Sequence, residues 1–176
     1  QFDLVAIQEI RDKSGTAIVQ LENMMDATGV DYNYIIGPRL GRTSSKVQYA
    51  YMYRADKIQP GKSYTADDPM DIFHREPFIA EFKTKEGNFD FILIQIHTDP
   101  ETATEEINAL PLAIKSASET FENENDFILL GDLNADCNYY NPSHQIAFTM
   151  ALSYPSKILI GDGTDTTVSK TDCAYD

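Results

Sequence analysis

The chain lacks several features that would place it in a specialised class of protein. Its 176 residues contain no apolar run that approaches the roughly 20 residues a membrane helix needs, and no internal repeat or low-complexity segment. No basic segment followed by an apolar stretch opens it, so the sequence shows no signal peptide, although a secreted protein whose signal has been removed is compatible with it. The composition, 42% hydrophobic and 24% charged, is that of one globular domain.

Basic residues are scarce. Only 14 Lys and Arg stand against 28 Asp and Glu, which gives a net charge of −14. Taken alone, this balance argues against nucleic-acid binding, which favours basic patches. The simplest interpretation is a solvated acidic surface. A second interpretation is that some carboxylates bind divalent metal ions, through which an acidic enzyme with a few placed arginines can bind a polyanion.

Cysteine is scarce too, since the chain has only Cys137 and Cys173. This number excludes a disulfide-dense scaffold, but it is the right number for one disulfide bond. The count alone leaves that bond and two buried free thiols as equal alternatives.

Strand-like apolar segments alternate with two helical patterns. We expect helices at 14–28 and 102–123, and strands at 2–9, 31–37, 47–54, 77–84, 88–97, 126–132 and, as a short one, 157–162. Met24 and Met25 lie at helical spacing with other apolar residues of the first helix, so we expect them in the core. Long apolar strands mixed with helices and hairpins predict an α/β fold, a two-sheet sandwich covered by helices.

Four apolar stretches each end on a polar residue. LVAIQ runs into Glu9, FILIQI into His97, FILLG into Asp132 and CAY into Asp176, with Asn134 two residues after Asp132. A single histidine at a strand end is most simply satisfied by a local hydrogen bond. Three carboxylates and a histidine in such places favour one shared site, because sites in α/β folds gather at strand ends.

These residue types suit a phosphate-ester hydrolase. Carboxylates with an amide oxygen are the hard ligands that Mg²⁺ or Mn²⁺ prefers, and such an ion can neutralise charge on a phosphoryl oxygen. A histidine beside them can transfer a proton, because its pKa lies near neutral.

The motifs around these residues resemble the endonuclease/exonuclease/phosphatase superfamily, and within it the deoxyribonuclease I branch. The similar segments, in chain order, are DLVAIQE, IQEIRD, PRLGRTSSK, HREPFIAEF, IHTDP, LLGDLNADC and DTTVSKTDCAYD. Any one of them alone is weak, but the ordered set is specific and spans nearly the whole chain. The resemblance implies a sandwich of two mainly antiparallel sheets flanked by helices. It also implies metal-dependent cleavage of double-stranded DNA to 5′-phosphate ends, with no membrane and no obligate protein partner.

The resemblance also implies roles for individual residues. Glu9 would bind Mg²⁺ or Mn²⁺, with Asp132 and Asn134 at the scissile phosphate, and His97 would be the general acid/base. Asp176 would orient a second catalytic histidine. DNA contacts are implied for Arg11, Arg42, Arg75, Thr171 and Tyr175.

Two structural Ca²⁺ sites and a disulfide bond complete what the resemblance implies. The first site would use Asp165 and Thr167, although this stretch is also typical of a polar loop capped by its own hydroxyls. The second would use Asp68, Asp71, the Phe73 carbonyl and Glu76. Cys137 and Cys173 fall where the branch has its main disulfide, which implies an oxidising compartment and therefore a secreted or periplasmic protein.

Three departures from the family pattern leave rival interpretations open. We expect residues 1–176 to form a single but incomplete domain, without the leading strand and without the C-terminal strands that carry the second catalytic histidine. Val47 stands where the family has a glutamate bonded to the catalytic histidine, and Ser45 where animal members have a tyrosine. The rivals are a catalytically impaired binding domain and a phosphoesterase acting on a lipid head group or inositol phosphate.

Overall fold

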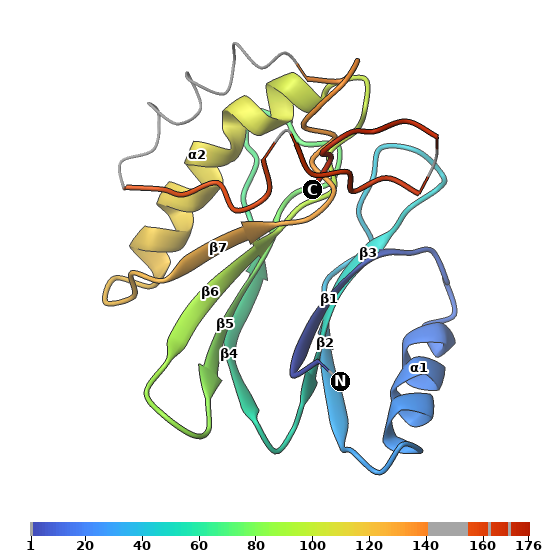
Figure 1. Cartoon of the computed structure of the whole chain (residues 1–176), viewed down its shortest axis with the longest axis vertical. Helices are drawn as coiled ribbons and strands as arrows, with labels where there is room; N and C mark the ends of the chain where they lie inside the picture. The colour runs from blue at the N-terminus through green and yellow to red at the C-terminus, as the bar shows by residue number, and fades with distance from the viewer. Residues whose placement is uncertain (1, 141–154, 162, 169) are drawn as a thin grey trace.

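Two β-sheets pack face to face in the computed structural model, which describes residues 2–140, 155–161, 163–168 and 170–176 (Figure 1). The first sheet is antiparallel, with the order β1-β3-β2, and consists of β1 (Leu4–Ile10), β3 (Gln48–Arg54) and β2 (Tyr32–Ile36). The second has the order β4-β5-β6-β7 and consists of β4 (Ile58–Thr65), β5 (Phe78–Thr84), β6 (Asp90–Gln95) and β7 (Phe127–Leu130). In it, only the β6–β7 pair is parallel. The expected two-sheet sandwich is therefore confirmed.

A helix covers the outer face of each sheet. Helix α2 (Ala103–Thr120) lies on the four-stranded sheet, where Ala113 and Ala117 pack with Ile79, Ile92 and Ile94. Helix α1 (Thr16–Asp26) lies beside the three-stranded sheet, where Ile18 packs with strand residues that include Ala50 and Met52. Within the described part of the chain, no helix has the length and apolar character that crossing a bilayer requires.

The space between the sheets is filled largely by aromatic rings. Side chains alternate across β3, so Tyr49, Tyr51 and Tyr53 point to the inner face, where they meet Phe78 and Phe82. The ring of Phe82 lies 5.3 Å from that of Tyr51 and 6.2 Å from that of Tyr53, and the Tyr51 hydroxyl donates to the Phe78 carbonyl over 2.9 Å. Tyr51 therefore buries a large ring while its hydroxyl stays hydrogen-bonded.

Several details differ from the sequence-based expectations. Strand β4 was not expected, because its segment contains Pro60 and Gly61; the structure accommodates them on a sheet edge, with a bulge between Pro60 and Ser63. The strand expected at 157–162 is wrong over the described residues 157–161, which are irregular and exposed. The prediction that Met24 lies in the core is wrong, because this residue is 71% exposed.

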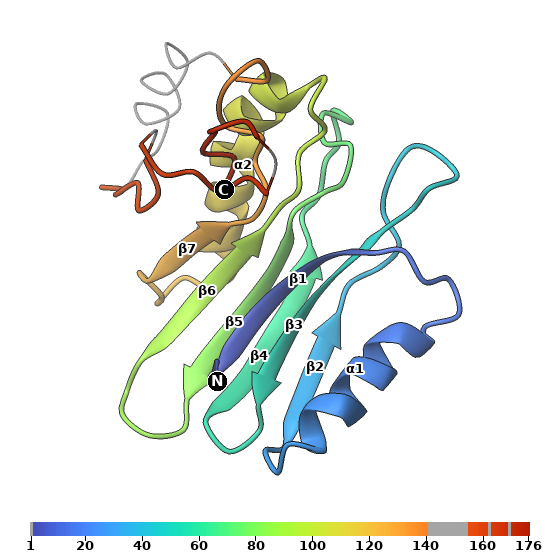
Figure 2. The same ribbon diagram turned by 45° about the vertical axis from the view of Figure 1, so that its right-hand side comes forward.

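The carboxyl ends of β1, β6 and β7 lie at one end of the sandwich (Figure 2). The C-terminal residues 163–168 and 170–176 lie at the same end (Figures 1 and 2). This arrangement follows from the parallel pairing of β6 and β7 and from the packing of β1 across the aromatic core. Polar residues that follow the three strands are thereby gathered from two different sheets.

The aromatic core should dominate the stability of the sandwich. Phe82→Ala deletes a fully buried ring, and we expect it to lower the free energy of unfolding by about 3–5 kcal/mol. Leu112→Ala, at a position that is 53% exposed on α2, is the control and should change it by less than about 0.5 kcal/mol. Urea titration followed by circular dichroism measures both, and equal losses in the two variants would contradict the central role of the ring.

Candidate active site

His97 lies between two carboxylates that come from different sheets. Its Nδ1 is 3.9 Å from Oε1 of Glu9, and its Nε2 is 3.7 Å from Oδ2 of Asp132. Glu9 belongs to β1, whereas His97 and Asp132 follow β6 and β7. The expected gathering of these three strand-end residues is therefore what the structure shows.

A β-bulge presents Glu9 to the site. The pairing of β1 with β3 shifts register between Ile7 and Ile10, and Glu9 has a left-handed φ of 55°. Such bulges re-aim side chains and are common beside active sites, where strained backbone is retained. The Glu9 carboxylate also accepts a hydrogen bond from Nη2 of Arg11 over 3.1 Å. The predicted DNA-contacting arginine is therefore beside the predicted metal ligand.

The backbone around His97 is held by hydrogen bonds on both sides. The His97 N–H donates to the Tyr49 hydroxyl over 2.8 Å, and the Thr98 N–H donates to the Asp132 carbonyl over 3.1 Å. Arg75 donates from Nε to the His97 carbonyl and from Nη2 to the Thr98 carbonyl, both over 2.8 Å. Arg75, predicted from the sequence as a DNA contact, therefore also fixes the loop that carries His97. Neither this contact nor that of Tyr49 left a signal in the sequence, because both involve backbone groups.

Two glutamine side chains cross the gap between the sheets. Gln8 donates from Nε2 to the Ile96 carbonyl over 2.7 Å and accepts from the Asp132 N–H over 3.3 Å. Gln95 donates in the opposite direction, to the Ile7 carbonyl over 3.0 Å. Sequence reasoning missed both residues; the available signal was an amide near the end of each apolar strand.

Asn134 is buried beside Asp132 and the loop that follows His97. Its N–H donates to Oδ1 of Asp132 over 3.1 Å, and its Nδ2 donates to the Thr98 carbonyl over 3.2 Å. It has a left-handed φ of 48° and only 4% exposure. Since the side-chain nitrogen is used within the protein, the side-chain oxygen is the atom suited to a metal ion or to a donor on a substrate.

Burial lowers the pKa of His97. The positive charge of Arg75 lowers it further, while Asp132, Glu9 and Asp99 act in the opposite direction. The net lowering favours a neutral imidazole, which can accept a proton at a ring nitrogen. Nδ1 is buried and has no hydrogen-bond partner among the described residues.

Val47, which departs from the family pattern, comes directly before β3. It is 3% exposed and precedes Tyr49 by two residues, so an extended backbone places both side chains on one face. A valine cannot accept the imidazole N–H.

The oxygen donors at Glu9 and Asp132 fit a divalent ion that keeps part of its water. Their side chains are 48% and 35% exposed, and both are hard carboxylates. Among the described residues, no further Asp, Glu, His or Cys completes a tight cluster with them. The tight cluster that the described residues do form, Asp136 with Cys137 and Cys173, offers no thiolate because the two cysteines are bonded to each other.

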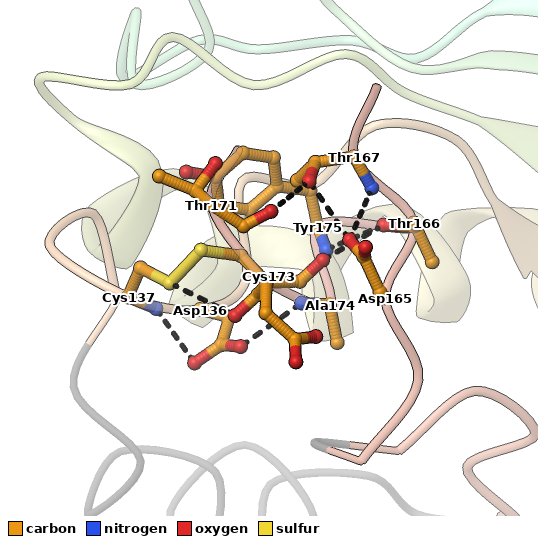
Figure 3. The surroundings of a disulfide bond; sticks show 10 residues. Asp136, Cys137, Asp165, Thr166, Thr167, Thr171, Cys173, Ala174 and Tyr175 are labelled. Atoms are coloured by element: carbon orange, nitrogen blue, oxygen red, sulfur yellow. Dashed lines mark hydrogen bonds between the residues drawn. A yellow bond between two sulfur atoms is a disulfide. The ribbon is translucent and has the colours of Figure 1, made fainter. Parts of the chain in front are cut away.

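The C-terminal segment is tied to the site by a disulfide and a carboxylate. Cys137 and Cys173 form the bond, which decides between the two alternatives that the sequence left open (Figure 3). Asp136 accepts from the backbone N–H of Cys137 over 2.6 Å and of Ala174 over 2.9 Å, and these hydrogen bonds lower its pKa. The Tyr175 carbonyl accepts from the Leu133 N–H over 2.8 Å, between Asp132 and Asn134 in the chain.

Asp176 follows this anchored segment and is exposed. Within the described residues, no ion pair joins it to a histidine: His74 is next to Asp99, at 3.4 Å, and His97 is next to Glu9 and Asp132. His144 lies outside the described residues.

The first predicted Ca²⁺ loop is closed by its own side chains. Oδ1 of Asp165 accepts from the N–H of Thr167 over 2.9 Å and from its hydroxyl over 2.8 Å, which lowers the Asp165 pKa (Figure 3). The Thr167 hydroxyl also donates to the Thr171 carbonyl. This geometry suits both a Ca²⁺ loop and a self-capped polar loop.

The second predicted Ca²⁺ loop binds an arginine. Oδ2 of Asp68 accepts from the Phe73 N–H over 2.7 Å, and Asp71, with a left-handed φ of 51°, lies 3.1 Å from Nη2 of Arg42. Phe73 is buried and Glu76 directly follows Arg75. The predicted DNA contact Arg42 and the predicted ligand Asp71 are thus paired with each other.

Known proteins align with the whole chain. It is 36% identical over 183 residues to deoxyribonuclease-1 of Gallus gallus, which covers 100% of the chain and 64% of that protein. It is 37% identical over 179 residues to deoxyribonuclease-1-like 1 of Chlorocebus aethiops, which covers 99% of the chain and 59% of that protein. The chain therefore spans somewhat less than two thirds of the length of these curated relatives. No established family profile matches it.

Solved structures share the fold. An endonuclease/exonuclease/phosphatase family protein from Bacteroides thetaiotaomicron superposes on 78% of the chain, with a TM-score of 0.55, 24% identity and 52% of that protein covered. A mannosyl-6-phosphatase of the same organism superposes on 99% of the chain and 69% of its own, with a TM-score of 0.57 and 20% identity. At these identities the likeness is one of fold.

The disulfide should stabilise the C-terminal segment against the site. It closes a loop of 36 residues, so replacing both cysteines by alanine should lower the free energy of unfolding by about 3–4 kcal/mol. Reduction should destabilise the wild type by a similar amount and leave the double variant unchanged, as followed by thermal melting. Two thiols that are freely alkylated in the air-oxidised native protein would contradict the bond.

Proposed function

The chain is a deoxyribonuclease I-like member of the endonuclease/exonuclease/phosphatase superfamily, and on this premise we propose that the protein is a divalent-metal-dependent endonuclease that hydrolyses phosphodiester bonds of DNA to 5′-phosphate ends. The observation that carries the proposal is the position of His97 between the carboxylates of Glu9 and Asp132. A phosphodiester hydrolase needs a group that moves a proton beside oxygen donors that hold a cation, and the three side chains supply both.

His97 would accept the proton of the attacking water. Burial and Arg75 keep the pKa of its ring low, so the neutral form is available at physiological pH. Because Nδ1 is buried, we assign the proton exchange to Nε2, on the side of Asp132. Asp132 would then stabilise the imidazolium that forms, and the Tyr49 and Arg75 hydrogen bonds would keep the loop in place.

Glu9, with the side-chain oxygens of Asp132 and Asn134, would hold Mg²⁺ or Mn²⁺. The bound ion would neutralise charge that develops on the phosphoryl oxygen. Arg11 would approach the DNA from beside Glu9, with Arg42, Arg75, Thr171 and Tyr175 as further contacts. Ca²⁺ would stabilise the loops around Asp165 and Asp71. The disulfide supports a secreted or periplasmic protein, because such bonds persist in oxidising compartments.

One observation favours a second candidate, a DNA-binding domain with impaired catalysis. The buried Nδ1 of His97 lies 3.9 Å from Glu9 but has no hydrogen-bond partner among the described residues, and Val47 stands where the family pattern has a glutamate bonded to the histidine. An imidazole whose far nitrogen makes no hydrogen bond lacks the contact that would fix its tautomer and hold the ring. Such a protein would bind DNA through the same surface but cleave it slowly.

Nicking of supercoiled plasmid tests the proposed function. EDTA should abolish the activity and Mg²⁺ or Mn²⁺ should restore it. His97→Gln should lower kcat by roughly 10²–10⁴-fold, the range of general acid–base assistance. The control is His74→Gln, which should keep most of the activity because His74 lies next to Asp99 and not next to Glu9 or Asp132. Activity that is unchanged in EDTA would rule out the metal mechanism, and hydrolysis of a phosphomonoester with no action on DNA would favour a phosphatase.

Val47→Glu should raise kcat if the missing acceptor limits the proton transfer. The new carboxylate would bond Nδ1 of His97 and raise its pKa, so the acid limb of the pH–rate profile should move to higher pH. Val47→Gln is the matched variant, because it can accept the hydrogen bond but carries no charge. Both need a melting temperature beside the kinetics, since burying a charge can destabilise the fold. Folded variants with unchanged kcat would mean that another group already orients the ring.

A further inference from the structure

We propose that Gln8 is the positioning residue that sets the spacing of Glu9, His97 and Asp132. The role rests on the proposed function, because it concerns the same site. No catalytic step is assigned to Gln8. Its side chain acts on the backbone that carries the reacting groups.

The contacts of Gln8 are the first reason. Gln8 directly precedes Glu9 in the chain. Its Nε2 donates over 2.7 Å to the carbonyl of Ile96, the residue that precedes His97. Its Oε1 accepts over 3.3 Å from the N–H of Asp132. One planar amide therefore connects the backbone at all three members of the site, across sequence separations of 88 and 124 residues.

The backbone at Gly131 is the second reason. Gly131 has a φ of 135°, in the region that favours glycine, and a Cβ built there would overlap the Ile96 carbonyl oxygen and the Gln8 amide nitrogen. The backbone at the end of β7 therefore lies so close to the Gln8 amide that there is no room for a side chain at position 131. Glycine directly before Asp132 therefore permits the hydrogen bond between the Asp132 N–H and Gln8.

The environment of the amide is the third reason. Glu9 lies on one sheet, and His97 and Asp132 follow two paired strands of the other, so no strand pairing fixes the distance from Glu9 to the other two residues. Apolar packing is non-directional and tolerates small sliding of one sheet over the other. A pair of hydrogen bonds from a short side chain is directional, and a displacement of about 1 Å can cost roughly 10²-fold in rate.

Gln95 provides a matched control within the same chain. It is also a glutamine that bonds across the sheets, to the Ile7 carbonyl over 3.0 Å, and its side chain is fully buried. Within the described part of the chain, it makes no hydrogen bond with the side chain or backbone of Glu9, His97 or Asp132. Removing it should cost stability through the same kind of bond and leave the geometry of the site intact.

The experiment compares Gln8→Leu with Gln95→Leu in the whole protein. We expect both to lower the urea midpoint. Gln8→Leu should also lower kcat for plasmid nicking by roughly 10–100-fold with little change in KM, and weaken Mn²⁺ binding measured by electron paramagnetic resonance by roughly 10-fold. Gln95→Leu should leave kcat and the Mn²⁺ dissociation constant within about twofold of the wild type.

Two further measurements keep the outcome decisive. If Gln8→Leu does not fold, Gln8→Glu replaces it, since it keeps an acceptor for the Asp132 N–H but cannot donate to Ile96, and an intermediate loss is expected. If the wild type does not nick DNA, the proposed function fails. The positioning role is then tested by NMR on the metal-free protein. Gln8 variants should shift the resonances of the Asp132 amide and the His97 ring, and Gln95→Leu should not. Gln8 variants that lose stability but leave kcat, Mn²⁺ binding and these resonances unchanged would overturn the proposal.

Discussion

The structure depends on how one β-sheet is held in register over another. Aromatic rings from β3, β5 and β6 fill the space between the sheets and keep them apart, but rings alone do not fix a lateral position. Directional bonds do so: the amides of Gln8 and Gln95 and the hydroxyl of Tyr51 each reach a carbonyl on the opposite sheet. Among these bonds, those of Gln8 reach the backbone beside His97 and Asp132, where the polar groups of the candidate site lie.

The arginines around the site bear on how an acidic chain could bind the proposed polyanionic substrate. The net charge of −14 opposes the approach of DNA, yet the arginines near the site are already engaged: Arg11 with Glu9, Arg75 with the His97 loop, and Arg39 with carbonyls that include those of Arg11 and Lys46. Their charge lowers the local repulsion while their hydrogen bonds order the loops. Divalent ions bound by the carboxylates would supply the remaining positive charge.

The sequence predicted most of the fold and the approximate location of the site, for identifiable reasons. Alternating or continuous apolar runs mark strands, and three of the four polar residues expected to meet at strand ends, Glu9, His97 and Asp132, lie close together. Strand β4 was missed because Pro60 lowers strand propensity, a cost that an edge position removes. Met24 misled because helical spacing does not show how much of a helix face a sheet covers. The roles of Gln8 and Arg75 were missed because a side chain that bonds a distant carbonyl leaves no pattern in the chain.

The long separation between Gln8 and Asp132 also bears on the order of folding. The two residues are 124 apart in the chain, so their bond closes a long loop. Contacts of this kind form slowly, because the chain loses the entropy of loop closure before the contact can stabilise it. Local units such as the β5–β6 hairpin have no such delay. During synthesis, the sheets can condense around their rings before residue 132 has emerged. The bond between Gln8 and Asp132 is therefore expected to form late in folding, after the sheets have packed.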